Sequence, residues 1–293
     1  MSAPARLDRE LLVRDFPLPR HPEDGDKEDR GRFLVIAGSR EVAGAALLAG
    51  VAGLRAGAGK LQIATAASVA VQLSIAVPEA LVVGCEETAE GCFAPSAIGS
   101  LVELAMDADA VTIGCGMQHG KALEALLDAL LASGARQPLV LDATVLGLLA
   151  PRADALCVWQ GGAALLPHSR EMARLLDCEA GEVEADPLAA ARRAAERFNA
   201  VTLIKGQYSH IVHPDGRAFR FEGGGIGLAT SGSGDTLAGI VGGLCARGAD
   251  PLRATLWGVY LHGEAGRLLS KDVARVGFLA REILDRVPGL MGD

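Results

Sequence analysis

Short apolar segments recur along most of this chain, and each is followed by a longer segment of helical character. A run of about four to six apolar residues bounded by Gly or Asp is typical of a strand buried on both faces of a sheet. Such strands lie parallel when helices connect them, and the helices then cover both faces. The pattern therefore predicts an α/β fold, a three-layer αβα sandwich around a mostly parallel sheet, with strands at 33–38, 60–65, 80–84, 110–114, 138–143 and 201–206.

The segments between these strands carry helix signals. We expect helices at 44–56, 122–131, 170–176 and 187–198, followed by two longer helices at 236–247 and 251–269. A different pattern occupies residues 210–221, where Asp215-Gly216 separates IVHP from AFRF. A tight hairpin turn requires backbone angles that Asp and Gly tolerate, so this segment predicts a late β-hairpin in an otherwise parallel fold.

The chain shows no linker, internal repeat or change of composition after its first 32 residues. We therefore expect residues 33–293 to form a single catalytic domain and residues 1–32 to form an N-terminal arm that lies on it. The helix expected at 44–57 is rich in Gly and Ala, which makes it a candidate for close packing against a neighbouring subunit.

The net charge and the composition of the N-terminal segment limit which kinds of molecule the protein can bind and where it can act. A net charge of −8 disfavours a nucleic-acid surface, because such surfaces neutralise phosphates with clustered Lys and Arg. Small phosphorylated ligands are still compatible, since backbone amides can bind them. The N-terminal segment has no apolar leader, which predicts a cytoplasmic protein. Residues 61–78 lack charge but contain Gln62 and Gln72 and divide into a strand and a helix, so we expect no membrane span.

The cysteines show no metal-binding spacing. No C-x-x-C pair occurs among them, and no nearby His completes a zinc pattern. We expect buried, reduced thiols at Cys85, Cys92, Cys115, Cys157, Cys178 and Cys245.

The passage ATSGSGD (229–235), which leads into a helix, is the most informative for chemistry. Gly232 and Gly234 allow backbone amides to converge, and the positive end of the helix dipole points at the same place. Ser233 lies between them, and Asp235 follows in the first turn. This arrangement predicts an anion hole for a phosphoryl group, with Asp235 as the base that deprotonates an attacking hydroxyl. The alternative is a capped helix N-terminus without catalytic meaning.

Two other glycine patterns are weaker. Residues 53–60 lack the glycine spacing of a P-loop, and Leu61 stands where a Ser or Thr would bind Mg²⁺. Gly114-Cys115-Gly116 follows a strand but lacks the third glycine of a dinucleotide fingerprint. Neither a Walker A motif nor a Rossmann-type site is therefore expected.

Several motifs together carry a family resemblance. From Arg32 to about Leu269 the chain resembles the ADP- or ATP-dependent NAD(P)H-hydrate dehydratases, a metabolite-repair branch of the ribokinase-like superfamily. The motifs are GRFLVIAGSREVAGAALLAG, Pro78-Glu79-Ala80, IGCGM (113–117), VLDAT (140–144), LLPHSREMARLL (165–176), IKGQYSHIV (204–212), GLATSGSGDTLAGI (227–240) and YLHGEAG (260–266). The resemblance implies a ribokinase-like fold and a lyase that uses an adenine nucleotide, ADP or ATP, and Mg²⁺ to return NADH or NADPH from its hydrate.

The resemblance also implies roles for individual residues. Asp235 is the implied catalytic base, with Gly232, Ser233 and Gly234 around it. The residues implied to contact the hydrated nicotinamide nucleotide are Ala45, Gly114, Gly116, His168 and Asp235. Those implied to contact the adenine nucleotide are Lys205, Gly206, Gln207, Tyr208, Ser209 and Gly234. His168 is alternatively a structural hydrogen-bonding residue. Glu171 either organises metal or water, or caps a helix.

The resemblance also has implications for assembly, and a few residues of this chain differ from those usual in the family. The resemblance implies a homo-oligomer, a tetramer by analogy, and an epimerase that is a separate protein. The family usually has Asp at Thr144 and Asn at Gly225, and the loss of both bears on metal geometry and nucleotide preference. It also usually has Pro at Cys115. A small-molecule kinase of the same fold and a non-catalytic nucleotide-binding relative are the alternative functions.

Overall fold

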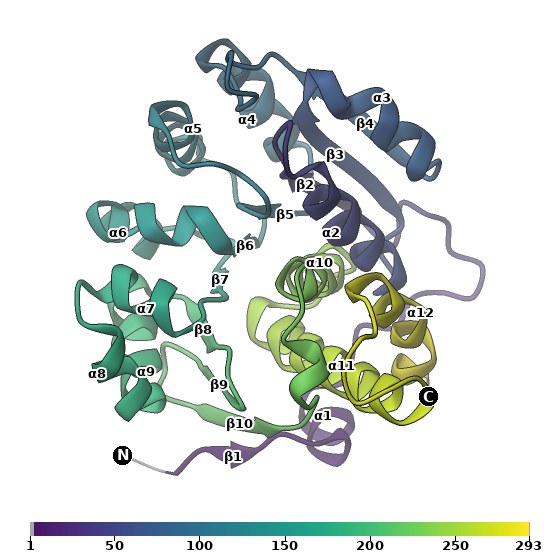
Figure 1. Cartoon of the computed structure of the whole chain (residues 1–293), viewed down its shortest axis with the longest axis vertical. Coiled ribbons are helices and arrows are strands. Elements are labelled where there is room, and N and C mark those ends of the chain that lie inside the picture. Colours follow the sequence, from purple (N-terminus) through teal and green to yellow (C-terminus); the bar gives the residue numbers. More distant parts are fainter. Residues whose placement is uncertain (1–2, 293) are drawn as a thin grey trace.

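A computed structural model of the chain describes residues 3–292; the first two residues of the expected arm and Asp293 lie outside the described residues. Within them, ten strands form one sheet in the order β1-β10-β9-β8-β7-β6-β5-β2-β3-β4 (Figure 1). In chain order the strands are β1 Ala5–Arg6, β2 Arg32–Ile36, β3 Lys60–Ala66, β4 Ala80–Cys85, β5 Ala110–Ile113, β6 Leu139–Leu141, β7 Ala163–Leu165, β8 Val201–Ile204, β9 Tyr208–Val212 and β10 Ala218–Glu222.

The sheet is parallel except around the late hairpin. Strands β2 to β8 pair in parallel with their neighbours, and β9 pairs antiparallel with both β8 and β10. The predicted α/β fold with its late hairpin is confirmed. Because the carboxyl ends of parallel strands meet at one edge, the loops that follow β5, β6, β7 and β8 lie next to one another.

Helices cover both faces of the sheet and divide the core in two. In β2, Phe33 and Val35 point into one apolar core while Leu34 and Ile36 point into the other, because successive side chains of a strand alternate. All four are fully buried. The helices are α1 Arg9–Asp15, α2 Ala43–Arg55, α3 Ala67–Ala76, α4 Ile98–Met106, α5 Lys121–Ala132, α6 Ala153–Cys157, α7 Ser169–Leu176, α8 Ala180–Ala185, α9 Pro187–Phe198, α10 Ser233–Ala246, α11 Pro251–Asp272 and α12 Ala280–Met291.

Small residues let α10 pack directly against α2. A methyl group added at Gly239 would lie 2.1 Å from the carbonyl oxygen of Ala49, and one added at Gly243 would lie 2.4 Å from that of Gly53. The Gly/Ala face of α2 is therefore covered by α10 of the same chain. The suggestion that this face packs against a neighbouring subunit is wrong, because the intramolecular contact already buries it. The contact also fixes the start of α10, where the glycine-rich loop enters it.

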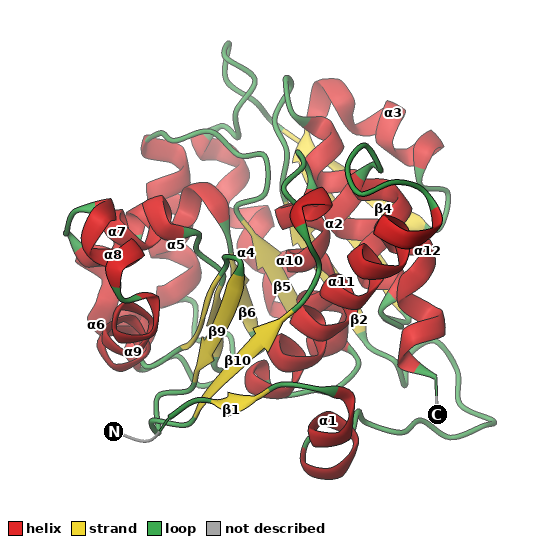
Figure 2. Ribbon diagram, turned by 60° about the horizontal axis from the view of Figure 1, so that its bottom comes forward, coloured by secondary structure: helices red, strands yellow, loops and turns green. Residues whose placement is uncertain are grey.

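Residues of the N-terminal segment extend the sheet and cover its edge. Strand β1 pairs with β10, and Figure 2 shows β1 and α1 at the lower edge of the molecule beside that strand. Leu12 of α1 is fully buried, and Trp257 Nε1 donates a hydrogen bond of 2.7 Å to the Phe16 carbonyl. This segment is therefore packed on the core by both backbone pairing and apolar contact.

The sequence patterns did not include several elements. Strand β7 has three residues, too few for a recognisable run, although it lies in the middle of the sheet. Strand β1 and helices α1, α4, α6, α8 and α12 were also missed. Among the helices of residues 3–292, none combines the length and apolarity needed to cross a membrane.

Candidate active site

Three strand ends and the start of one helix bring the residues of the candidate site together. Cys115 lies just beyond β5, Asp142 follows β6, and Lys205 follows β8. Asp235 lies in the first turn of α10. These residues are far apart in sequence, and the parallel order of the strands places them at the same edge of the sheet, next to α10 (Figure 1).

The glycine-rich loop enters α10 with its amides exposed to the site. Gly232 is the N-cap, with φ of 86°, a left-handed conformation that glycine adopts without strain. No side chain caps this end of the helix. Within the described part of the chain, no hydrogen-bond acceptor pairs with the amides of Gly234 and Asp235. Two free N–H groups and the helix dipole therefore favour an anion at this position.

A compact cluster of polar groups faces these amides. The Cys115 sulfur and one carboxylate oxygen each from Asp142 and Asp235 lie within 4.8 Å of one another. Lys205 Nζ donates a hydrogen bond of 2.8 Å to Asp142 Oδ1. A methyl group added at Gly234 would lie 3.6 Å from Lys205 Nζ, so the ammonium group borders the start of α10.

The environment sets the charge of each member of the cluster. Burial, followed by the charge of Asp142, raises the pKa of Asp235 to about 6, while Cys115 and Lys205 lower it. Burial alone would lower the pKa of Lys205, but the carboxylates of Asp142 and Glu171 outweigh it and raise that pKa. Burial and the nearby carboxylates raise the pKa of Cys115, so its thiol stays protonated. Asp235 can thus take up and release a proton near neutral pH.

His262 forms hydrogen bonds to the end of the glycine-rich loop, a role that the sequence did not predict. Its Nε2 lies 2.9 Å from Ser233 Oγ and 3.1 Å from the Ser233 carbonyl oxygen. Burial lowers the pKa of His262 to about 4, so the ring is neutral. A neutral His on α11 therefore holds the first residue of α10. The motif YLHGEAG contained this residue, but its sequence position gave no sign that it meets the loop.

The expected substrate-contact residues Ala45 and Gly116 lie against each other. A methyl group added at Gly116 would lie 2.6 Å from Ala45 Cβ and 2.8 Å from the Val42 carbonyl oxygen. Gly114 is equally restricted, because a methyl group there would lie 1.9 Å from the Asp142 carbonyl oxygen. Both glycines have positive φ. The turn after β5 therefore requires glycine on each side of Cys115.

His168 and Glu171 form the capped start of α7. His168 Nδ1 accepts hydrogen bonds from the amides of Arg170 and Glu171, and Glu171 Oε2 accepts one of 2.9 Å from the His168 amide. This is a capping box, the helix-cap alternative for Glu171. The His168 ring is half exposed, and its Nε2 lies 3.5 Å from Glu171 Oε1.

The segment from Lys205 to Ser209 leaves the site along the sheet. The amide of Lys205 donates to the Pro167 carbonyl, which joins this segment to the loop that bears His168. Gly206 and Gln207 form the turn into β9. Tyr208 is partly exposed, and the Arg220 guanidinium carbon lies 4.2 Å from its ring centroid. Lys205 is thus in the polar cluster, whereas Tyr208 lies beyond it.

The polar cluster does not fit a resident Mg²⁺ site. One of its three candidate ligands is a protonated thiol, a soft ligand that Mg²⁺ does not prefer. Asp142 is already paired with the Lys205 ammonium, a positive charge where a cation would lie. Thr144 does not add a ligand, because its hydroxyl donates to the Met117 carbonyl.

The architecture and this site together define a class. A mostly parallel sheet between two helical layers, with a glycine-rich loop opening a helix above its strand ends, makes the chain an α/β protein of the ribokinase-like superfamily. The family model described as NAD(P)H-hydrate dehydratase matches residues 33–289. The chain belongs to this family.

Individual relatives agree with the family match. The chain is 46% identical over 280 residues to an ADP-dependent (S)-NAD(P)H-hydrate dehydratase from Xanthomonas campestris, covering 95% of this chain and 93% of that protein. It is 36% identical over 291 residues to a bifunctional NAD(P)H-hydrate repair enzyme from Moorella thermoacetica, and covers 98% of this chain but 55% of that one. The chain thus spans about half of the bifunctional relative. A solved Bacillus subtilis ADP/ATP-dependent NAD(P)H-hydrate dehydratase, co-crystallised with ATP/Mg²⁺, superposes with a TM-score of 0.81 at 28% identity, covering 99% and 98% of the two chains.

Proposed function

We propose that this chain dehydrates NAD(P)H hydrate back to NADH or NADPH at the expense of ADP or ATP. One observation carries the proposal: the Asp235 carboxyl, with a pKa of about 6, lies beside two free amides at the start of α10. A proton acceptor next to an anion hole is the arrangement that phosphoryl transfer to a hydroxyl requires.

The first step is transfer of the terminal phosphoryl group to the ring hydroxyl of the hydrate. Asp235 accepts the hydroxyl proton as the oxygen attacks phosphorus, and the bond from phosphorus to the leaving nucleotide oxygen breaks. The amides of Gly234 and Asp235 stabilise the charge on the transferring group, and Gly232 and Ser233 hold the turn that presents them. Lys205 adds positive charge beside the same position.

The second step is elimination. The phosphate ester is a good leaving group where the hydroxyl was a poor one, so phosphate departs and a proton is lost from the neighbouring ring carbon. The new double bond restores the dihydropyridine. We place the hydrated ring between Asp235 and the surface formed by Ala45, Gly114 and Gly116, with His168 at its rim.

The adenine nucleotide occupies the neighbouring segment Lys205, Gly206, Gln207, Tyr208 and Ser209 in this proposal, with its phosphates reaching Gly234. Mg²⁺ enters as the nucleotide complex, bound by the phosphates, because the polar cluster does not fit a resident ion. Glu171 remains a prediction as a metal ligand, and its capping role competes with it.

We further propose the domain boundaries, the cellular location and the assembly of this protein. The catalytic domain comprises residues 33–293 with residues 1–32 as an arm, which the family match to 33–289 supports. The protein acts in the cytoplasm. It assembles as a homo-oligomer, a tetramer by family analogy. An epimerase that acts in the same pathway is its proposed partner.

A repair assay tests the activity directly. The full chain is incubated with Mg²⁺, ADP or ATP, and NADH hydrate, and the absorbance of the regenerated dihydropyridine is followed. We expect recovery that depends on the nucleotide. Phosphorylation of a pyrimidine alcohol without repair would establish the kinase alternative instead, and nucleotide binding without turnover would establish the non-catalytic one.

The pH profile tests the role of Asp235. We expect kcat/KM for the hydrate to fall as the pH drops through about 6, because burial and then Asp142 raise the pKa of Asp235 to about 6 and only the ionised base accepts a proton. Asp142→Asn removes one cause of the raised pKa, so its acid limb should move to lower pH. Asp154→Asn, an exposed Asp in the first turn of α6, serves as the control. A profile that is flat from about pH 5 to 7 contradicts this role.

Gly234→Ala separates the anion hole from the fold. The added methyl group meets nothing closer than 3.6 Å, and Ala is the better helix former, so thermal stability should be unchanged or slightly higher. The methyl group does occupy space beside Lys205 and Asp142. We expect nucleotide affinity to fall about tenfold, as for the loss of one charged contact.

The matched comparison for this variant is Gly239→Ala in the same helix. Its methyl group would lie 2.1 Å from the Ala49 carbonyl oxygen, so this variant should lose stability instead. Calorimetric titration with ADP and thermal unfolding distinguish the two. Unchanged ADP affinity in Gly234→Ala would place the phosphates elsewhere.

A further inference from the structure

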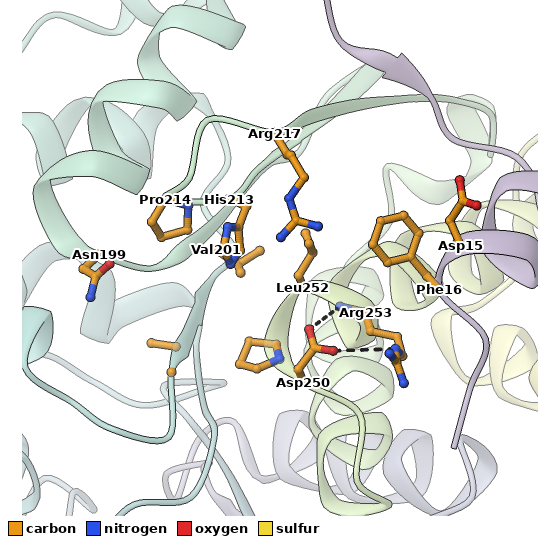
Figure 3. A pocket seen from close by; sticks show the side chains of 13 residues that line it. Asp15, Phe16, Asn199, Val201, His213, Pro214, Arg217, Asp250, Leu252 and Arg253 are labelled. Atoms are coloured by element: carbon orange, nitrogen blue, oxygen red, sulfur yellow. Dashed lines mark hydrogen bonds and ion pairs between the residues drawn. The ribbon is translucent and has the colours of Figure 1, made fainter. Parts of the chain in front are cut away.

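A cavity of about 500 Å³ lies at the edge of the sheet opposite the candidate active site (Figure 3). Ala163 and Val201 on its wall are the first residues of β7 and β8, whereas the active-site Lys205 follows the last residue of β8. The length of β8 separates the two places by roughly 13 Å along the strand. The cavity is therefore distinct from the site described above.

The floor and one side of the cavity are apolar and fixed. Ala163, Val201 and Leu252 contribute buried side chains to it. Phe16 lines another side, and its ring packs edge-on against Phe219 at a centroid distance of 5.4 Å. A preformed apolar wall of this kind suits a flat apolar group.

Arg217 extends over this floor from the β9–β10 turn. In Figure 3 its guanidinium group points toward Leu252, between His213 and Phe16. Asp215 Oδ2 accepts a hydrogen bond of 2.8 Å from Arg217 Nε and so orients the group. No acceptor among residues 3–292 meets the two terminal nitrogens, which leaves their N–H groups free toward the cavity.

Arg253 contributes a second guanidinium group from the first turn of α11. Its Nε is buried and has no hydrogen-bond partner in the described structure. Arg253 forms an ion pair with Asp250, whose Oδ2 lies 3.6 Å from Nε, beyond hydrogen-bond distance (Figure 3). A buried donor without an acceptor costs free energy, which a ligand oxygen would recover.

The acidic side chains of the cavity wall, Asp15 and Asp250, already accept hydrogen bonds from neighbouring residues. Both carboxylate oxygens of Asp15 accept hydrogen bonds of 2.8 Å from Arg14. Asp250 caps α11 by accepting from the Arg253 amide. His213 Nδ1 lies 3.2 Å from the Asp215 amide nitrogen and 3.0 Å from Asp215 Oδ1. The Arg217 and Arg253 guanidinium groups are therefore the charged hydrogen-bond donors that the cavity offers to a ligand.

We propose that this cavity is a second ligand site, which binds a compact organic anion: a carboxylate or phosphate monoester attached to a flat apolar body. The anionic group contacts Arg217 and Arg253. The body lies on Leu252 and Val201, against the Phe16 ring. The site does not depend on the proposed activity, because its residues lie outside the polar cluster around Asp235.

Calorimetric titration of the full chain with two aryl anions tests the proposal. The probes are 1-naphthyl phosphate and 1-naphthoate, added with ADP at saturation so that the nucleotide site is occupied. We expect one probe molecule to bind per chain, and the tighter of the two identifies the preferred head group. Arg217→Gln and Arg253→Gln should each weaken binding about tenfold, the effect of one charge-assisted contact.

Arg267→Gln is the matched control. Arg267 is exposed to a similar degree as Arg217, 57% against 51%, and its Nε also donates to a carboxylate, at 2.7 Å. This variant should bind the probes as the parent chain does, and thermal unfolding confirms that all three variants fold. Equal binding of neutral 1-naphthol, equal weakening by Arg267→Gln, or binding that ADP abolishes overturns the second site. Binding of inorganic phosphate as tight as that of the aryl probes overturns the apolar part of the proposal.

Discussion

Asp235→Asn is expected to abolish repair and to make the protein more stable. Loss of a general base costs about 10²–10⁴ in rate, so turnover should fall by about a thousandfold. The pKa of Asp235 is raised to about 6 in the fold, above its value of 3.8 in a model peptide, with burial as the first cause. The folded state therefore holds this proton more tightly than the unfolded chain does.

The sign of the stability change follows from that difference. A raised carboxyl pKa gives stability that is fully present below the unfolded-state value of 3.8 and is lost as the pH rises from there through about 6. At pH 7.5 and above the ionised group opposes folding, and the neutral Asn side chain removes this cost. We expect a gain of about 2 kcal/mol, seen as a rise of a few degrees in Tm.

Measuring Tm at two pH values isolates the effect. At about pH 3.5, below the value of 3.8 for the unfolded chain, the carboxyl is largely protonated in both states, so Asp235→Asn should no longer be clearly more stable than wild type. Asp154→Asn, exposed on α6, should change neither turnover nor Tm. An Asp235→Asn protein that keeps its activity, or that is less stable at pH 8, contradicts the role given to this residue.

Lys205→Met is expected to be among the most destabilising single changes in the site. Asp142 is almost completely buried and Lys205 Nζ is its partner at 2.8 Å, so the variant leaves an unpaired buried carboxylate. Removing one member of a buried ion pair costs about 3–5 kcal/mol. The pKa of Asp235 should also rise further, because Lys205 is one of the groups that lower it.

A second substitution separates charge from packing. In Lys205→Met/Asp142→Asn the buried charge is gone, so the denaturant midpoint should return most of the way to the wild-type value. Activity should not return, because the positive charge beside the anion hole is still missing. Lys271→Met at an exposed position of α11 is the control and should behave as wild type. A double variant no more stable than Lys205→Met would show that packing, not charge, causes the loss.

The strand pattern and the glycine-rich loop were predictable because their causes are local. Strands such as β2 and β8 are buried on both faces, so their apolar runs are visible without any neighbour. Helix α9 begins at Pro187 and ends at Phe198 as predicted, since its first and last turns carry their own signals. Strand β7 was missed because three residues give no periodicity.

The sequence by itself determined the class of fold, the family and the position of Asp235 at the start of a helix, since each of these depends on residues that are close along the chain. Only the tertiary structure decided which groups surround that carboxyl. Cys115, Asp142 and Lys205 meet it because β5, β6 and β8 are near neighbours in the sheet, and His262 meets Ser233 because α11 packs against α10. A raised pKa arises from such burial and proximity, and neither is encoded in any single segment.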